Sequence, residues 1–233
     1  MKSFEGREIH ARAAQAREAG KHLEALQLTD QAMLAYHQDA DLLGLAEVLA
    51  DRSLILRHIN DASEDSTILI IAKYEMMAAV EIAESSGQKD ALSLPYFNLA
   101  KVQESLGELH NAVSSYKKAV ENMVNNPPSQ HNRPAVLADM MIHLSVCEYR
   151  SGDKSGLERS LTALADLEGA DEVKYNKDVW TSGAHMKIAE MLKDDDLNKA
   201  KEHLQKAKEI IDSNPDLKLR AAQWLELSKK ING

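Results

Sequence analysis

The clearest pattern of apolar and polar positions lies near the middle of the chain. Apolar or small residues recur there every three or four positions in two runs, first at Tyr96, Leu99 and Ala100 and then at Leu109, Ala112, Tyr116 and Ala119. This period is typical of an amphipathic helix. Gly107 separates the runs and suits a turn that needs a positive φ. The segment 93–124 is therefore predicted to be an antiparallel helical hairpin.

The same pattern recurs at intervals of 40 to 47 residues. The last small or apolar positions of successive units are 47, 40, 45 and 43 residues apart, at Ala32, Ala79, Ala119, Leu164 and Ala207. Repetition at this period is typical of stacked supersecondary units that bury their apolar faces on one another. Five helical hairpins are predicted, near residues 6–37, 42–85, 93–124, 135–167 and 178–212.

A final amphipathic segment, 215–231, is predicted to be a helix that caps the end of the stack. Asn214 and Pro215 form a helix start signal at its beginning. The longest polar connection, 125–134, is expected to be a flexible loop, and the repeat resumes directly after it. We therefore predict a single all-α domain spanning residues 1–233, in keeping with an aromatic content of only 4%.

The order Gly107, Leu109, Ala112, Tyr116, Ala119 resembles the signature of the tetratricopeptide repeat. The spacing of 40 to 47 residues is similar to that of the long-helix type of this family. The resemblance implies a right-handed α-solenoid whose first helices line a concave groove. It also implies that this groove binds peptides or segments of partner proteins.

The resemblance places the outward positions of the first helices in that groove. These candidate positions are Arg7, His10, Arg17, Glu47, Asp51, Phe97, Lys101, Glu104, Ile142, Val146, Tyr149, Arg150, His185 and Leu192. They mix both signs of charge with apolar side chains. Phe97 and Tyr149 are candidate anchors for a peptide because aromatic residues often carry binding energy. Packing between neighbouring units is an equal alternative for both.

The charge balance bears on the class of partner. The formal net charge is −9, and the first 125 residues hold 12 basic and 19 acidic residues, a net charge of −7. Nucleic-acid binding needs clustered basic residues, so DNA and RNA are not expected partners. No apolar run approaches the roughly 18–20 residues of a membrane span, and no membrane association is expected. The single cysteine, Cys147, excludes an intrachain disulfide and gives no sign of an oxidising compartment, which favours the cytoplasm.

The sequence offers little for catalysis. Nine histidines are scattered with no two at helical i, i+3 or i+4 spacing, and neither an HExxH motif nor a Gly-rich phosphate loop occurs. Cys147 is expected in the core, and Asp194–Asp196 is expected to form a turn before a helix. The pairs Met76–Met77 and Met140–Met141 are expected in the core, with an adaptable binding surface as the alternative. We predict no catalytic, cofactor or metal residues.

Three function classes remain, in decreasing order of support. The first is a non-catalytic interaction module, monomeric or weakly self-associating, that binds a peptide or a partner helix in its groove. The second is a peptide-sensing regulatory domain that changes superhelical shape when its ligand binds. The third is an enzyme, which has no recognisable motif in its favour.

Overall fold

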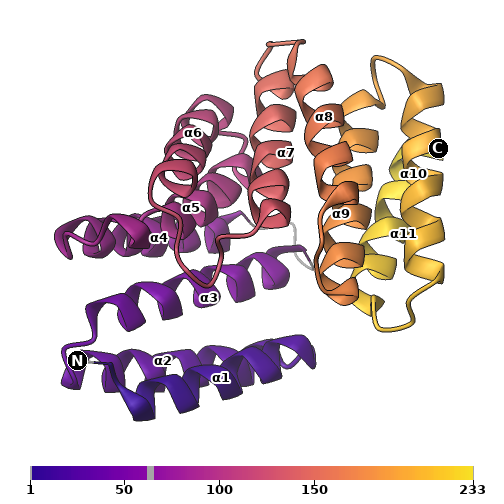
Figure 1. The fold of residues 1–233 in the computed structure, drawn as a ribbon. Coiled ribbons are helices and arrows are strands. Elements are labelled where there is room, and N and C mark those ends of the chain that lie inside the picture. The colour runs from indigo at the N-terminus through magenta and orange to yellow at the C-terminus, as the bar shows by residue number, and fades with distance from the viewer. Residues whose placement is uncertain (1, 62–65, 233) are drawn as a thin grey trace. The chain divides into compact units, whose positions relative to one another are not determined.

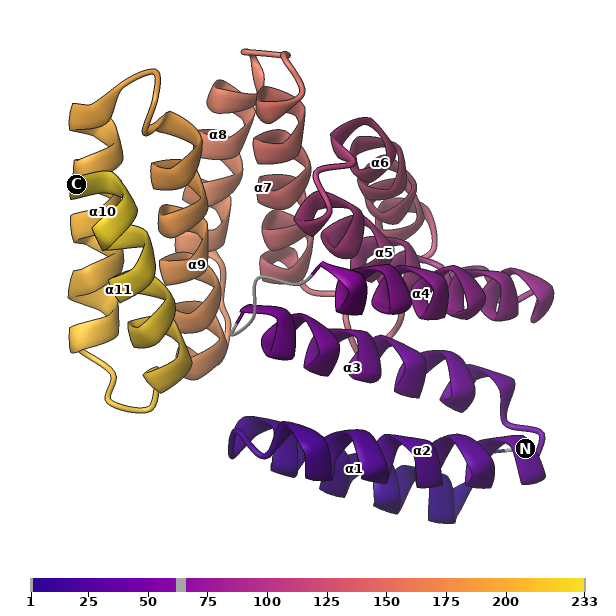
Figure 2. The ribbon, with the colours of Figure 1, turned by 180° about the vertical axis from the view of Figure 1, so that it is seen from behind.

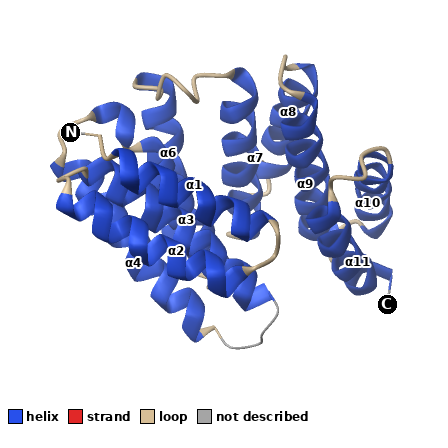
Figure 3. Ribbon diagram, turned by 90° about the horizontal axis from the view of Figure 1, so that it is seen from below, coloured by secondary structure: helices blue, strands red, loops and turns tan. Residues whose placement is uncertain are grey.

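The computed structural model describes residues 2–61 and 66–232, which divide into two compact units, Met1–Ser129 and Gln130–Gly233. The described residues form helices and loops without a β-strand (Figure 3). The all-α class predicted from the sequence is confirmed. The boundary between the units falls in the polar connection 125–134. That the two units act as a single domain stays a prediction.

The described part of the first unit consists of three helical hairpins (Figures 1 and 2). Their helices are α1 (Phe4–Glu18), α2 (His22–Gln38), α3 (Leu42–Asp61), α4 (Thr67–Ser85), α5 (Ser93–Ser105) and α6 (Leu109–Asn125), with the short 3-10 helix η1 (Lys89–Ala91) before α5. The helices of each hairpin pack along their length, and α2 and α4 also contact the first helix of the next hairpin. This is the nearest-neighbour packing of a repeat protein.

The second unit contains two hairpins and a closing helix. These are α7 (Pro134–Arg150), α8 (Gly156–Gly169), α9 (Lys174–Leu192), α10 (Leu197–Asp212) and α11 (Lys218–Asn232). Helix α11 lies against α9 and α10 (Figure 1), where Ile231 and Trp224 pack with Ala189 and Leu204. The Trp224 indole N–H also donates a hydrogen bond of 2.8 Å to the Leu204 carbonyl. The predicted capping helix is confirmed.

The start of the capping helix requires a correction. It was predicted at Pro215, but α11 begins at Lys218. The side-chain oxygen of Asn214 accepts a hydrogen bond of 3.2 Å from the Asp216 N–H. This Asx turn holds Pro215 in the connection between α10 and α11. Asn214 thus closes a turn and does not cap the helix.

The signature residues of the third hairpin act as predicted. Ala100, Ala112 and Ala119 are fully buried where α5 meets α6, and the small side chains let the helix axes approach. Gly107 has a φ of +76° in the turn, a conformation that costs glycine little. Tyr116 is also fully buried, and its hydroxyl donates a hydrogen bond of 2.7 Å to Glu104. Gly107, Ala112, Tyr116 and Ala119 of the signature are thus explained by packing or turn geometry.

The other structural expectations are met in most places. Cys147, Met76 and Met140 are buried, whereas Met77 is exposed. The aspartates before α10 form the predicted turn, and the Asp196 carboxylate accepts a hydrogen bond of 3.1 Å from the Lys199 N–H at the helix start.

Helix α8 buries short residues. Gly156 and Ser160, four positions apart on one side of the helix, are buried, whereas Leu161 is exposed. A Cβ at position 156 would overlap the Ser145 carbonyl oxygen on α7. The short residues of α8 allow a closer approach to α7 than leucine would.

Replacing Gly156 with alanine tests this close approach. The alanine Cβ would overpack against the α7 backbone, which should lower the free energy of unfolding by about 1–3 kcal/mol. Alanine also has a higher helix propensity than glycine, by about 1 kcal/mol, but this gain is outweighed by the overpacking. Gly169→Ala at the other end of α8 is the matched control, since a Cβ there meets nothing within 4 Å. Urea unfolding of both variants gives the comparison. Equal stability of Gly156→Ala and wild type would contradict the packing described.

Candidate functional site

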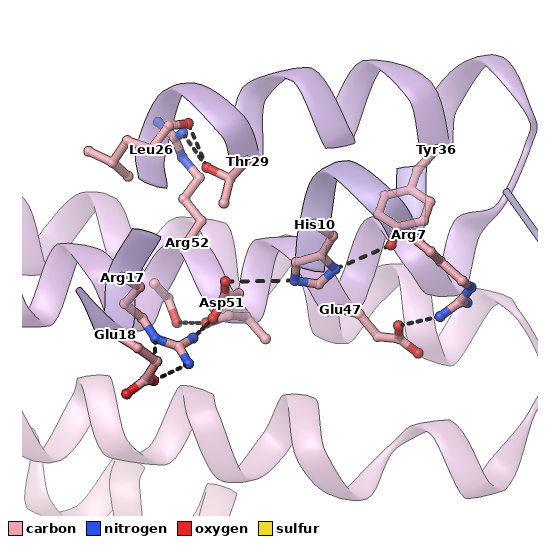
Figure 4. Close-up of polar contacts among 12 residues, drawn as sticks. Arg7, His10, Arg17, Glu18, Leu26, Thr29, Tyr36, Glu47, Asp51 and Arg52 are labelled. Atoms are coloured by element: carbon pink, nitrogen blue, oxygen red, sulfur yellow. Dashed lines mark hydrogen bonds and ion pairs between the residues drawn. The ribbon is translucent and has the colours of Figure 1, made fainter. Parts of the chain in front are cut away.

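The predicted groove residues of the first two hairpins meet one another between α1 and α3 (Figure 4). Arg7 on α1 contacts Glu47 on α3 with 3.2 Å between Nη1 and Oε2. His10 lies 3.7 Å from a carboxylate oxygen of Asp51, and Arg17 forms an ion pair with the other oxygen of Asp51. These five residues are called the α1/α3 network.

Helical spacing brings the network together. Arg7, His10 and Arg17 lie at i, i+3 and i+10 along α1, and Glu47 and Asp51 lie at i and i+4 on α3, so each set occupies one face of its helix. Basic residues line the α1 side and acidic residues the α3 side. The sequence alone placed these residues in one surface but did not reveal that they bind each other.

The network is graded from buried to exposed. The side chain of Asp51 is only 10% exposed, whereas that of Glu47 is 55% exposed. The Arg17–Asp51 pair is therefore weakly screened by solvent, and the Arg7–Glu47 pair is well screened. The inner pair connects α1 and α3 in a little-exposed position, and the outer pair is more open to solvent.

His10 is neutral in this setting. Burial, followed by the nearby Arg17 and Arg7 charges, lowers its pKa below the usual value. Its Nδ1 atom lies 3.2 Å from the Tyr36 hydroxyl. The unprotonated Nδ1 of a neutral imidazole can accept a hydrogen bond from the Tyr36 hydroxyl, and its Nε2–H then points toward Asp51.

Tyr36 and Asp41 support the network and were not among the predicted residues. Tyr36 is fully buried, and burial raises its pKa to about 12. The Asp41 carboxylate accepts hydrogen bonds of 2.8 Å from the Ser3 N–H and 3.0 Å from the Gly44 N–H, and Arg7 lies 3.5 Å away. Burial opposes ionisation of Asp41, but these N–H groups and Arg7 outweigh it and lower its pKa. An aspartate directly before a helix is a capping signal that could have indicated this role.

The third hairpin contributes one partly exposed side chain to the predicted surface. Phe97 and Glu104 are buried. Phe97 packs on Tyr116 with ring centroids 5.6 Å apart, and Glu104 accepts the Tyr116 hydrogen bond. Lys101 is partly exposed, with its ammonium 4.1 Å from the centre of the Phe97 ring. The expectation of an exposed Phe97 anchor is therefore corrected: the ring belongs to the core and Lys101 covers it.

The predicted positions in the second unit are mostly buried. Ile142, Val146, Tyr149 and Leu192 belong to one apolar cluster because α7 packs against both α8 and α9. The Tyr149 hydroxyl donates a hydrogen bond of 2.5 Å to Asp195. The Lys154 ammonium lies 4.0 Å from the centre of the Tyr149 ring. These side chains are part of the core, which corrects their expected exposure. Arg150 alone of the predicted residues on α7 is exposed.

His185 is also buried, where it pairs with a histidine that the sequence pattern did not single out. The Nδ1 atoms of His185 and His203 are 2.9 Å apart, and Nε2 of His185 lies 3.3 Å from Glu168. Burial is the main cause that lowers the pKa of each histidine to about 4. Both are neutral near pH 7, with one Nδ1 donating to the other. An open depression of about 380 Å³ lies beside His185 and is also lined by Lys206 and Glu209.

A metal centre has no geometric support in the ranges 2–61 and 66–232. Within them, no group of three or more histidine, cysteine, aspartate or glutamate side chains is arranged to hold a metal ion. The α1/α3 network is thus best described as a charged surface with a buried ionic base. Its exposed members can form ion pairs and hydrogen bonds with a ligand.

Comparison with known proteins agrees with the architecture. Residues 95–122 match the tetratricopeptide repeat family. The segment coincides with the hairpin of α5 and α6, which carries the signature described above. No curated protein matches the chain in sequence.

Solved structures extend the likeness to most of the chain. BtubC (BKLC) from P. vanneervenii superposes with a TM-score of 0.62 at 20% identity, covering 89% of this chain and 80% of that one. The kinesin light chain nearly identical TPR-like repeats of Podosopora anserina give a TM-score of 0.57 at 14% identity, covering 93% and 95%. A substituted form of the same repeats gives 0.61 at 13% identity, covering 89% and 94%.

These findings define the class of protein. The chain has the fold of a tetratricopeptide-like helical repeat protein and contains one segment that matches the family itself. Repeats of this family generally mediate protein–protein interaction, and the fold is typically non-catalytic. Across the described residues, every helix is too short or too polar to cross a lipid bilayer.

Loss of the Asp51 carboxylate should destabilise the first unit. In Asp51→Ala, Arg17 and His10 keep their half-buried positions but lose their shared partner. The free energy of unfolding should therefore decrease by about 1–3 kcal/mol. Glu47→Ala removes an exposed pair and should cost less than about 1 kcal/mol. Urea unfolding measures both. Similar losses from the two changes would contradict the graded network.

The buried histidines predict a pH dependence of stability. Burial lowers the pKa of His58, His185 and His203 to about 4, whereas the same groups in the unfolded chain titrate near 6.5. Between pH 6.5 and pH 4, each of these histidines is protonated in the unfolded state but largely neutral in the folded state. The unfolded state thus binds up to about one more proton per histidine, and the free energy of unfolding decreases as the pH falls.

The measurement is urea unfolding between pH 7 and pH 5. The stability of His203→Gln should depend less steeply on pH than that of wild type, because the variant lacks one of the histidines whose pKa differs between the folded and unfolded states. His110→Gln changes an exposed histidine on α6 and is the control. A wild-type stability that increases as the pH falls through this range would refute the explanation.

Proposed function

We propose that this protein is a non-catalytic interaction module that binds a peptide or a helix of a partner protein on the α1/α3 network and the neighbouring Lys101. The observation that carries the proposal is the arrangement of charge on α1 and α3. Opposite charges face each other there, and they are buried at the Asp51 end and exposed at the Glu47 end. The general role of tetratricopeptide repeats in protein–protein interaction supports the same interpretation.

The burial pattern separates the residues that hold the surface from those that contact the ligand. Arg17 and Asp51 form an ion pair in a little-exposed position and connect the two helices. Arg7 and Glu47 are the exposed members of the network, and Lys101 is partly exposed. A ligand that carries both an acidic and a basic group can pair with these side chains at a low cost in conformational entropy, because the surface is already ordered.

The proposed partner is a protein segment and not a nucleic acid, since the net charge is −9 and most of it lies in the first unit. We place the protein in the cytoplasm. A single cysteine, Cys147, buried in the core, fits a reducing compartment.

A displayed peptide library supplies ligands of varied sequence for the proposed surface. Peptides selected on the wild-type protein should lose at least about tenfold in affinity for an Arg7→Glu, Lys101→Glu double variant, because both changes reverse a charge on that surface. Lys201→Glu on the exposed face of α10 is the control for a charge reversal outside that surface. Titration calorimetry measures affinity, and circular dichroism confirms that each variant is folded.

Two results would overturn the proposal. One is undiminished binding of the selected peptides to the folded double variant, which would place the binding surface elsewhere. The other is an equal loss in the Lys201→Glu control, which would indicate a general charge effect.

A further inference from the structure

The methionine pair on α4 combines one buried and one exposed thioether. Met76 is fully buried, whereas Met77 is 45% exposed. Successive residues of a helix point about 100° apart, so the two side chains leave α4 in different directions. Met76 belongs to the buried side of the helix. Met77 belongs neither to that buried side nor to the α1/α3 network, and packing does not explain it.

Met77 differs in accessibility from the other methionines that the structure describes. Most of these are at most 7% exposed, namely Met76, Met123, Met140, Met186 and Met191. Met33 and Met141 are partly buried. Within residues 2–61 and 66–232, Met77 is therefore the methionine most open to a reagent in solution.

The neighbours of Met77 along the helix leave its side chain open. Tyr74 is itself 64% exposed, and Glu81, one turn after Met77, is exposed as well. Lys73, one turn before Met77, forms an ion pair with Glu108 on α6, with 2.6 Å between Nζ and Oε1. This long side chain is thus engaged with the next hairpin.

We propose that Met77 is a reversible oxidation site at which hydroperoxides modify the folded protein. The thioether sulfur attacks one oxygen of the peroxide, the O–O bond breaks and an S–O bond forms. The sulfur gives up two electrons and becomes a sulfoxide, and the peroxide is reduced to water, or to an alcohol if it is organic. Exposure selects Met77, because the susceptibility of a sulfur to oxidants follows its accessibility.

The reverse step has a known chemical class. Two thiols reduce the sulfoxide to the thioether, the oxygen leaves as water and the thiols are joined as a disulfide. Methionine sulfoxide reductases catalyse this step, with one enzyme for each sulfoxide epimer. An exposed helix surface gives such an enzyme access to Met77.

The sulfoxide at Met77 should leave the fold intact. Its polar oxygen stays hydrated at an exposed position, whereas an oxygen added at Met76 or Met123 would be buried among apolar side chains at a cost in stability. The first oxidation therefore falls on a side chain that does not hold the core together. It makes the outward face of α4 more polar.

Mass spectrometry after timed exposure of the native protein to dilute hydrogen peroxide tests the site. The tryptic peptide that follows Lys73 and ends at Lys89 contains both methionines of α4, and backbone fragmentation between them assigns the oxygen. Met77 should gain an oxygen at least about tenfold faster than Met76 or Met123, because buried thioethers react only when the structure opens. Equal rates at Met77 and Met76 would overturn the proposal.

Two leucine variants separate the site from general oxidation. Met77→Leu should lose the fast uptake of oxygen, whereas Met123→Leu removes a buried methionine and should keep it. Circular dichroism confirms that both variants are folded. A folded Met77→Leu protein that takes up its first oxygen as fast as wild type does would contradict the assignment.

Reversibility is tested on protein oxidised only at Met77. Its urea unfolding midpoint should equal that of untreated protein. Incubation of the folded protein with a pair of methionine sulfoxide reductases, one for each epimer, and dithiothreitol should remove the added oxygen. A lowered midpoint would show that Met77 supports the fold, and a sulfoxide that persists through this treatment would refute reversibility.

Discussion

The structure depends on the close approach of paired helices at small side chains. Ala13 and Ala25, Ala100 and Ala112, and their counterparts in the other hairpins are fully or almost fully buried, and they leave room for two helix backbones to lie in contact. Gly156 extends the same constraint to the second unit, where even a methyl group would overlap the α7 backbone. Once the hairpins are fixed in this way, the orientation of every other side chain follows from its helical position.

The placement of the charged surface is one consequence. With α1 packed on α2, and α2 on α3, the charged positions of α1 and α3 come into contact with each other. The Arg17–Asp51 pair then lies in a little-exposed position. Because both charges lose hydration there, the pair stabilises the fold only if its geometry is good enough to offset that loss. Tyr36 and Asp41 support the surface from α2 and from the turn before α3. The network is thus a product of the repeat packing, and its more exposed end is also tied to the fold through the contact of Arg7 with the buried Asp41.

The sequence predicted the architecture well and the site only in part. All five hairpins and the capping helix were predictable, because small residues and turn glycines recur at a regular interval. The exposure of single residues was not, because a template gives the direction of a side chain but not the depth of its neighbours. The predicted groove positions on first helices that prove to be buried are Phe97, Ile142, Val146, Tyr149, His185 and Leu192. The His185–His203 contact joins residues 18 positions apart on different helices, which no local spacing reveals.

We propose that ligand binding takes place on the first helices of the first unit. Backbone amide chemical shifts, recorded while a peptide selected on this protein is titrated in, locate the contact surface directly. Shift changes should be concentrated on α1, on α3 and on the turn of α5 that contains Lys101. Changes confined to α2, α4 and α6, or to the second unit, would contradict it.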